Sequence, residues 1–158
     1  MIYGLIDRKN QKVYTYMRVV FKAIGNAQEN YNWLITDCEC YPKSTEIAQM
    51  FDQEYCWLSG KELSHIAAQE DFQWIWGILC GFEKDIPLEE VLKYPLPLAR
   101  DYDGYYHNPV SLQHPLSSVE IVPFDSSWTL IVSKDKMIVD RYLSCYPKAE
   151  DLSQFNQQ

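Results

Sequence analysis

The last third of the chain has the clearest alternation of hydrophobic and polar positions. Apolar Val119, Ile121 and Pro123 alternate with Ser118, Glu120 and Val122. This period of two predicts a strand over 118–123 with one buried face and one polar face. Short polar side chains at 125–127 suit a turn, and the aromatic and β-branched residues 128–132 predict a second strand. Ser133 is then placed to cap a helix over 134–146.

Apolar positions at steps of three and four predict one regular helix near the start of the chain. It spans 12–24, with Asn10 placed to cap its beginning. Gly25 stands where a left-handed residue is expected after the last turn.

Shorter elements follow from local patterns and capping residues. Strands are predicted over 1–6 (an edge strand), 31–38, 55–58 and 71–82, and short helices after Ser44, over 59–68 and over 85–92. The segment 71–82 is the most apolar, so we expect it at the centre of the sheet. Because the last two strands join by a hairpin, the pattern predicts a single α+β domain over 1–158. Its sheet is expected to be mixed or mainly antiparallel, with several short helices packed on it.

Residues 94–115 form a different kind of segment, with four prolines, four tyrosines and no period of two or 3.6. A connection of this length inside a domain usually has a function or is disordered. Its prolines and aromatic residues favour a long ordered loop, used either as a binding surface or as a packed lid. The polar residues 148–158 are expected to form a surface tail.

Composition and charge narrow the classes of function. The chain has 158 residues, 47% hydrophobic and 15% aromatic, and a net charge of −8. Residues 29–90 contain thirteen carboxylates and three lysines, giving −10, which disfavours nucleic acid. This charge suits either ordinary solubility or the attraction of a basic protein partner. No apolar run approaches the length of a membrane span, and no secretory signal is evident. Together with five cysteines, an odd number, these features predict a cytoplasmic protein.

Motifs for metal, cofactor or nucleophilic chemistry are weak. Cys38 and Cys40 share one face of a strand, but a tetrahedral metal site needs further ligands that the spacing does not supply. No glycine-rich nucleotide motif occurs, so we expect no metal and no cofactor. His107 and His114 flank the long loop near Asp101 and Asp103, which leaves a small hydrolase or transferase as the alternative function.

The favoured site is the tyrosine-rich loop, because Tyr, Trp and Arg dominate the energetic centres of protein interfaces. The candidate binding residues are Arg100, Asp101, Tyr102, Asp103, Tyr105, Tyr106, His107 and His114. No residue is assigned a catalytic role. The sequence leaves the oligomeric state open.

Three segments resemble those of small uncharacterised bacterial proteins in the domain-of-unknown-function class. They are HPLSSVEIVPFDSSWTLIVSKD, YPKAEDLSQFN and YNWLITD. Some such families are described as immunity proteins, which neutralise a toxin deployed between competing cells. The resemblance implies an acidic cytosolic α+β protein that blocks a basic toxin domain by binding it. It carries over no functional residue.

Overall fold

The centre of the molecule is the strand–turn–strand unit expected near the end of the chain. In the computed structural model, which describes residues 1–9 and 15–158, β6 (Val119–Phe124) and β7 (Trp128–Ser133) pair antiparallel. Asp125 and Ser126 in the turn have positive φ angles of 49° and 62°, which short polar residues tolerate. The hairpin prediction is confirmed.

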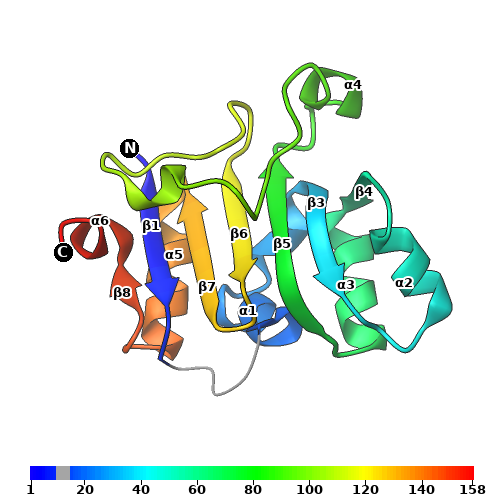
Figure 1. The fold of residues 1–158 in the computed structure, drawn as a ribbon, viewed down its shortest axis with the longest axis horizontal. Helices are drawn as coiled ribbons and strands as arrows, with labels where there is room; N and C mark the ends of the chain where they lie inside the picture. The colour runs from blue at the N-terminus through cyan, green and yellow to red at the C-terminus, as the bar shows by residue number, and fades with distance from the viewer. Residues whose placement is uncertain (10–14) are drawn as a thin grey trace.

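The other strands extend this hairpin into one sheet with the order β4-β3-β5-β6-β7-β1-β8 (Figure 1). They are β1 (Tyr3–Asp7), β3 (Asn32–Cys40), β4 (Tyr55–Ser59), β5 (Gln73–Phe82) and β8 (Glu150–Asp151). The short β2 (Thr15–Tyr16) pairs with β5 off this path, and every described pair is antiparallel. The α+β prediction is therefore confirmed, and β5 lies inside the sheet between β3 and β6.

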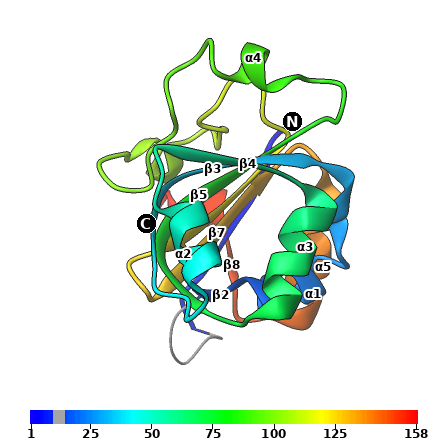
Figure 2. The same cartoon turned by 90° about the vertical axis from the view of Figure 1, so that its right-hand side faces the viewer.

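Four of the helices cover one face of the sheet, whereas the long loop and two short helices lie over part of the opposite face (Figure 2). The helices are α1 (Met17–Ala23), α2 (Thr45–Phe51), α3 (Gly60–Gln69), α4 (Leu88–Val91), α5 (Lys136–Cys145) and α6 (Leu152–Phe155), with 3-10 turns η1 (Ala27–Asn30) and η2 (Gly104–Tyr106). Apolar residues of α1, α2, α3 and α5 form one core cluster with the sheet. A second cluster joins the other face to Val91, Ala99, Tyr105 and Leu152. We call residues 92–118, which carry η2 and cross this second face, the excursion.

Local capping follows the sequence in most places. Ser44 caps α2, and Ser59 and Glu62 form the expected capping box of α3. Gly25 has a φ of 67°, the left-handed conformation expected after α1. α1 itself begins only at Met17, because Thr15 and Tyr16 pair with β5, and the predicted cap Asn10 lies outside the described residues.

Two predictions at the end of the chain are wrong. Helix α5 is capped by Asp135, because β7 continues to Ser133, where it pairs with β1 and β6. Residues 148–158 are not a simple surface tail. They form β8, which pairs with β1, and α6, whose Leu152 is 0% exposed. Strand β1 is consequently paired on both sides and is not an edge strand.

The prediction that the strand over 118–123 has one buried face and one polar face is also wrong. β6 lies inside the sheet, with helices over one face and the excursion over the other, so positions on both faces are buried. Glu120, expected on a polar face, is 0% exposed. A carboxylate in this place needs partners, and these partners define the candidate site.

Candidate functional site

The buried carboxylate of Glu120, on β6 of the sheet, binds the excursion through hydrogen bonds. Its Oε1 accepts hydrogen bonds from the Tyr105 hydroxyl at 2.8 Å and the Gln113 backbone N–H at 2.6 Å. Its Oε2 accepts from the His114 backbone N–H at 2.9 Å and the Ser117 hydroxyl at 2.6 Å, and Cys80 Sγ lies at 3.5 Å. Both oxygens of the buried carboxylate are therefore satisfied, mostly by groups of the excursion.

A second carboxylate, Asp37, holds the part of the excursion around Arg100. Asp37 Oδ2 accepts from the backbone N–H groups of Ala99 at 2.8 Å and Arg100 at 2.7 Å. Asp37 Oδ1 accepts from the Arg100 guanidinium, with Nη2 at 2.9 Å and Nε at 3.2 Å. Asp37 has a φ of 50° and sits where the β3–β5 register shifts, so the irregular strand aims its carboxylate at the excursion.

Further bonds fix the segment between these two carboxylates. The Thr36 hydroxyl donates to Pro97 O at 2.7 Å. The Gln113 side-chain amide bonds both main-chain groups of Leu98, at 2.7 Å and 2.9 Å. The excursion is thus ordered, as predicted, and much of its anchoring is through its main chain.

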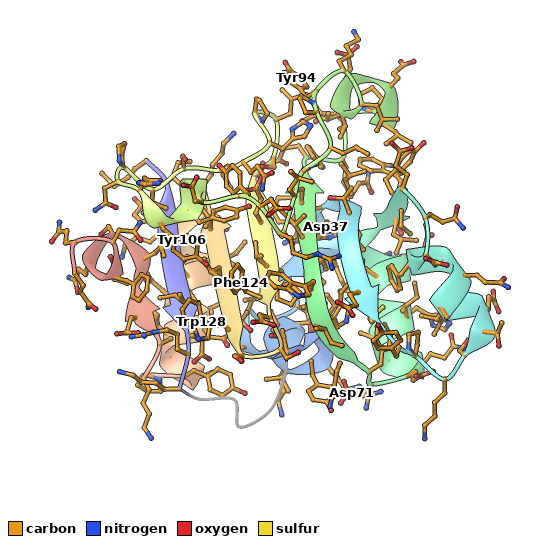
Figure 3. The ribbon with its side chains drawn as sticks, viewed as in Figure 1. Asp37, Asp71, Tyr94, Tyr106, Phe124 and Trp128 are labelled. Atoms are coloured by element: carbon orange, nitrogen blue, oxygen red, sulfur yellow. The ribbon has the colours of Figure 1, made fainter. Side chains whose placement is uncertain are left out.

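Beside the excursion lies a continuous set of half-buried rings, which we call the aromatic face. It consists of Trp76, Tyr106, Phe124, Trp128 and Phe155. Phe124 stands at its centre, with ring centroids 4.6 Å from Trp76, 5.7 Å from Trp128 and 6.1 Å from Tyr106. Phe155 of α6 completes the set, 6.3 Å from Trp128. Figure 3 shows Tyr106, Phe124 and Trp128 together on the side of the sheet that the excursion crosses.

Two arginines lie over the aromatic face at opposite ends. The Arg8 guanidinium is 4.8 Å from the Phe155 ring centroid and 5.8 Å from that of Trp128, and it makes two hydrogen bonds to Glu150. The Arg100 guanidinium is 5.7 Å from the Trp76 centroid. Because each arginine is held by a carboxylate while its guanidinium lies over a ring, the face combines cationic and aromatic groups in fixed positions.

Tyr106 gives the aromatic face a polar group. Its hydroxyl is buried and has no hydrogen-bond partner among the residues described. Burial raises the pKa of the Tyr106 hydroxyl to about 12, so it is a neutral donor at physiological pH.

The predicted binding residues fall into an exposed and a buried group. Asp101, Asp103 and His107 are exposed, and Tyr102 is half-buried with its ring centroid 4.9 Å from that of Tyr105. Tyr105 is 2% exposed because its hydroxyl is directed to Glu120. The inner side of the excursion therefore packs on the sheet, as a lid would, and its outer side is exposed to solvent. The binding role of its outer residues stays a prediction.

The two loop histidines do not share an environment. His114 is buried, its Nε2 bonds Val91 O at 2.9 Å, and its Nδ1 accepts the Leu116 N–H at 3.1 Å. His107 is exposed beside Asp103, with Nε2 3.4 Å from the carboxylate. The arrangement needed for the alternative acid–base function, both imidazoles in one pocket with a carboxylate, is not seen.

Sequence reasoning missed Glu120, Asp37 and most of the aromatic face. A partial signal was present at Glu120, because a charged residue inside an otherwise apolar strand indicates either a polar face or a buried anchor. Phe155 was assigned to the tail, and only the structure brings it beside Trp128.

Across residues 1–9 and 15–158, no set of three or more His, Cys, Asp or Glu side chains is placed to hold a metal ion. Within the same part of the chain, no helix has the length and apolar character needed to cross a membrane. No family model, curated protein or solved structure matches the chain.

Proposed function

We propose that this protein is a non-enzymatic binding module that recognises a basic protein through the aromatic face and the outer side of the excursion. A toxin neutralised in the manner of an immunity protein is the partner that the sequence resemblance suggests. The observation that carries the proposal is the anchoring of the excursion by Glu120 and Asp37.

This anchoring matters because association costs free energy whenever loops and side chains must be ordered. The main-chain bonds from Asp37 to Ala99 and Arg100, and from Glu120 to Gln113 and His114, order the excursion before any partner arrives. The binding surface is thus preformed, and little of the interaction energy is lost on ordering.

The chemistry of the surface also favours a protein partner. Large aromatic rings and arginines supply most of the binding energy at protein interfaces. The exposed carboxylates of Asp101 and Asp103 continue the overall charge of −8 and would speed the approach of a basic protein.

The proposal is tested by isolating the partner from cells of the native host, then measuring its affinity for purified variants. Replacing Trp128 with Ala is expected to weaken binding about 30-fold, the effect of removing a 2 kcal/mol interface residue. The control Met137→Ala removes an apolar side chain that is 55% exposed on α5, away from this surface, and should leave affinity unchanged. Thermal unfolding of Trp128→Ala separates lost binding from lost folding.

A second variant cannot act through the core, because both its positions are exposed. Asp101→Asn with Asp103→Asn is expected to slow association several-fold at low salt and to reduce its salt dependence. Glu29→Gln, an exposed acid on η1, is its control. Unchanged affinity in both test variants would reject this surface. Because stacked rings beside arginines also suit single-stranded nucleic acid, tight binding of an oligonucleotide would reject the protein partner.

A further inference from the structure

Two free thiols face each other at the end of β3, outside the proposed binding surface. The Sγ atoms of Cys38 and Cys40 are 3.6 Å apart, with Cys38 donating its hydrogen bond to Cys40. Of the remaining cysteines, Cys56 and Cys80 are buried, and Cys145 is exposed on the last turn of α5.

The short distance comes from the irregular backbone of β3. Residues i and i+2 of a strand share a face. The β3–β5 register shifts between Thr36 and Glu39 and again between Glu39 and Cys40, and such bulges bend the strand that carries them. The irregular part of β3 therefore lies in 36–40, the segment that contains both thiols.

The pair is accessible to a small molecule. Both thiols are half-buried, and both line an open pocket of about 360 Å³ between the end of β3 and α2. Glu39, Tyr41, Ala48 and Gln49 complete much of its wall. A reagent of modest size can enter this pocket and reach sulfur, whereas burial keeps it from Cys80.

We propose that Cys38 and Cys40 form a reversible dithiol–disulfide site that exchanges with small-molecule disulfides such as oxidised glutathione. In a reducing compartment the pair rests as two thiols. Closing the disulfide requires the sulfur atoms to move from 3.6 Å to about 2 Å.

The hydrogen bond assigns the two roles. Because Cys38 donates to Cys40, the Cys40 sulfur accepts this hydrogen bond and is the atom placed to attack first. The hydrogen bond to Cys40, followed by burial, raises the pKa of the Cys38 thiol, so Cys38 keeps its proton in the first step. Cys40 is accordingly the attacking residue and Cys38 the resolving one.

The exchange balances in two steps. The Cys40 thiolate attacks one sulfur of oxidised glutathione, forming a mixed disulfide and releasing one glutathione thiolate, which takes up the proton that Cys40 lost. Cys38 then attacks the Cys40 sulfur, the mixed S–S bond breaks, and a second glutathione leaves with the Cys38 proton. The protein loses two hydrogens and one glutathione disulfide is reduced to two thiols.

The test uses the full chain, equilibrated in buffers of reduced and oxidised glutathione, quenched in acid and alkylated, followed by peptide mass spectrometry. We expect a Cys38–Cys40 disulfide whose population follows the glutathione ratio. Cys38→Ser is expected to trap glutathione on Cys40, and Cys40→Ser is expected to leave Cys38 unmodified. Cys145→Ser should leave the 38–40 disulfide unchanged.

Two results would overturn the proposal. One is a wild-type protein that takes up glutathione only at Cys145 and forms no internal disulfide at any ratio. The other is equal glutathione labelling of Cys38 in Cys40→Ser and of Cys40 in Cys38→Ser, which would remove the assigned order. Circular dichroism of each variant confirms that the comparison is made on folded protein.

Discussion

Glu120 shows how one residue can determine the shape of a long loop. Burying a carboxylate without partners is very unfavourable, so a chain with Glu at this place is stable only if donors surround it. The excursion supplies most of these donors, through Tyr105, Gln113, His114 and Ser117. The burial of Glu120 and the order of the excursion consequently depend on the same hydrogen-bond network.

Glu120→Gln is predicted to destabilise the fold by about 3 kcal/mol, because the side-chain amide replaces one acceptor oxygen with a donor that faces other donors. Urea unfolding at neutral pH measures this change. Glu54→Gln, an exposed position after α2, is the matched control and should stay within about 0.5 kcal/mol of wild type. A Glu120→Gln protein as stable as its control would show that the network does not depend on charge.

Among the elements, α3 depends on a close approach of its first residue to the backbone of η1, which its helical sequence pattern does not indicate. Gly60 is the first residue of α3 and packs directly on the backbone of η1. A Cβ at this position would contact Gln28 O and would lie 2.6 Å from Glu29 Cα and 2.8 Å from Tyr31 O. Backbone atoms cannot rotate away as a side chain can, so only glycine fits here.

Gly60→Ala is therefore predicted to destabilise the protein by about 2 kcal/mol through overpacking, although alanine favours helices by up to about 1 kcal/mol over glycine. Thermal and urea unfolding measure the difference. Lys61→Ala, an exposed change in the same turn, serves as the control and should be close to neutral. A stabilised Gly60→Ala protein would mean that helix propensity outweighs the contact with η1.

The elements also show where sequence reasoning succeeds. The β6–β7 hairpin and the capping box at Ser59 were predictable because their signals are local: an alternating pattern with turn residues, and two side chains three positions apart. The end of the chain was not. β8 and α6 exist because β1 offers them a pairing partner and a buried place for Leu152, and that contact joins positions more than 140 residues apart. The unusual composition of the excursion is likewise a local signal and could be recognised. Its anchors on β3 and β6 are contacts between residues distant in the sequence and could not be predicted.

At the scale of the whole molecule, burial raises the pKa of several cysteine thiols and tyrosine hydroxyls, which therefore keep their protons in the folded state. Burial raises the pKa of Cys56 from 9.0 to about 11 and that of Tyr106 from 10.0 to about 12. Burial also raises the pKa of Tyr105, with the charge of Glu120 as the next cause. In each case the folded state keeps its proton at a pH where the unfolded chain has released it.

These shifts predict a fold that weakens in alkali. Below about pH 9 both states bind these protons and stability does not depend on them. From about pH 9 to 12 unfolding releases protons, so the free energy of unfolding falls as pH rises. Urea midpoints measured from pH 7 to 11 under reducing conditions should decline above pH 9, and Tyr106→Phe should reduce the decline between pH 10 and 11. A midpoint that does not change over this range, or the same decline in Tyr106→Phe, would contradict the prediction.

The way the excursion is attached has a consequence for engineering new specificities. Asp37 and Glu120 bind it largely through main-chain N–H groups, and Thr36 binds the carbonyl of Pro97. Such bonds do not depend on which side chain a residue carries. Exposed positions such as 103 and 107 can therefore be randomised in a library while the loop keeps its path. This small protein thus offers a display scaffold whose varied loop is held in place by residues that the randomisation would never touch.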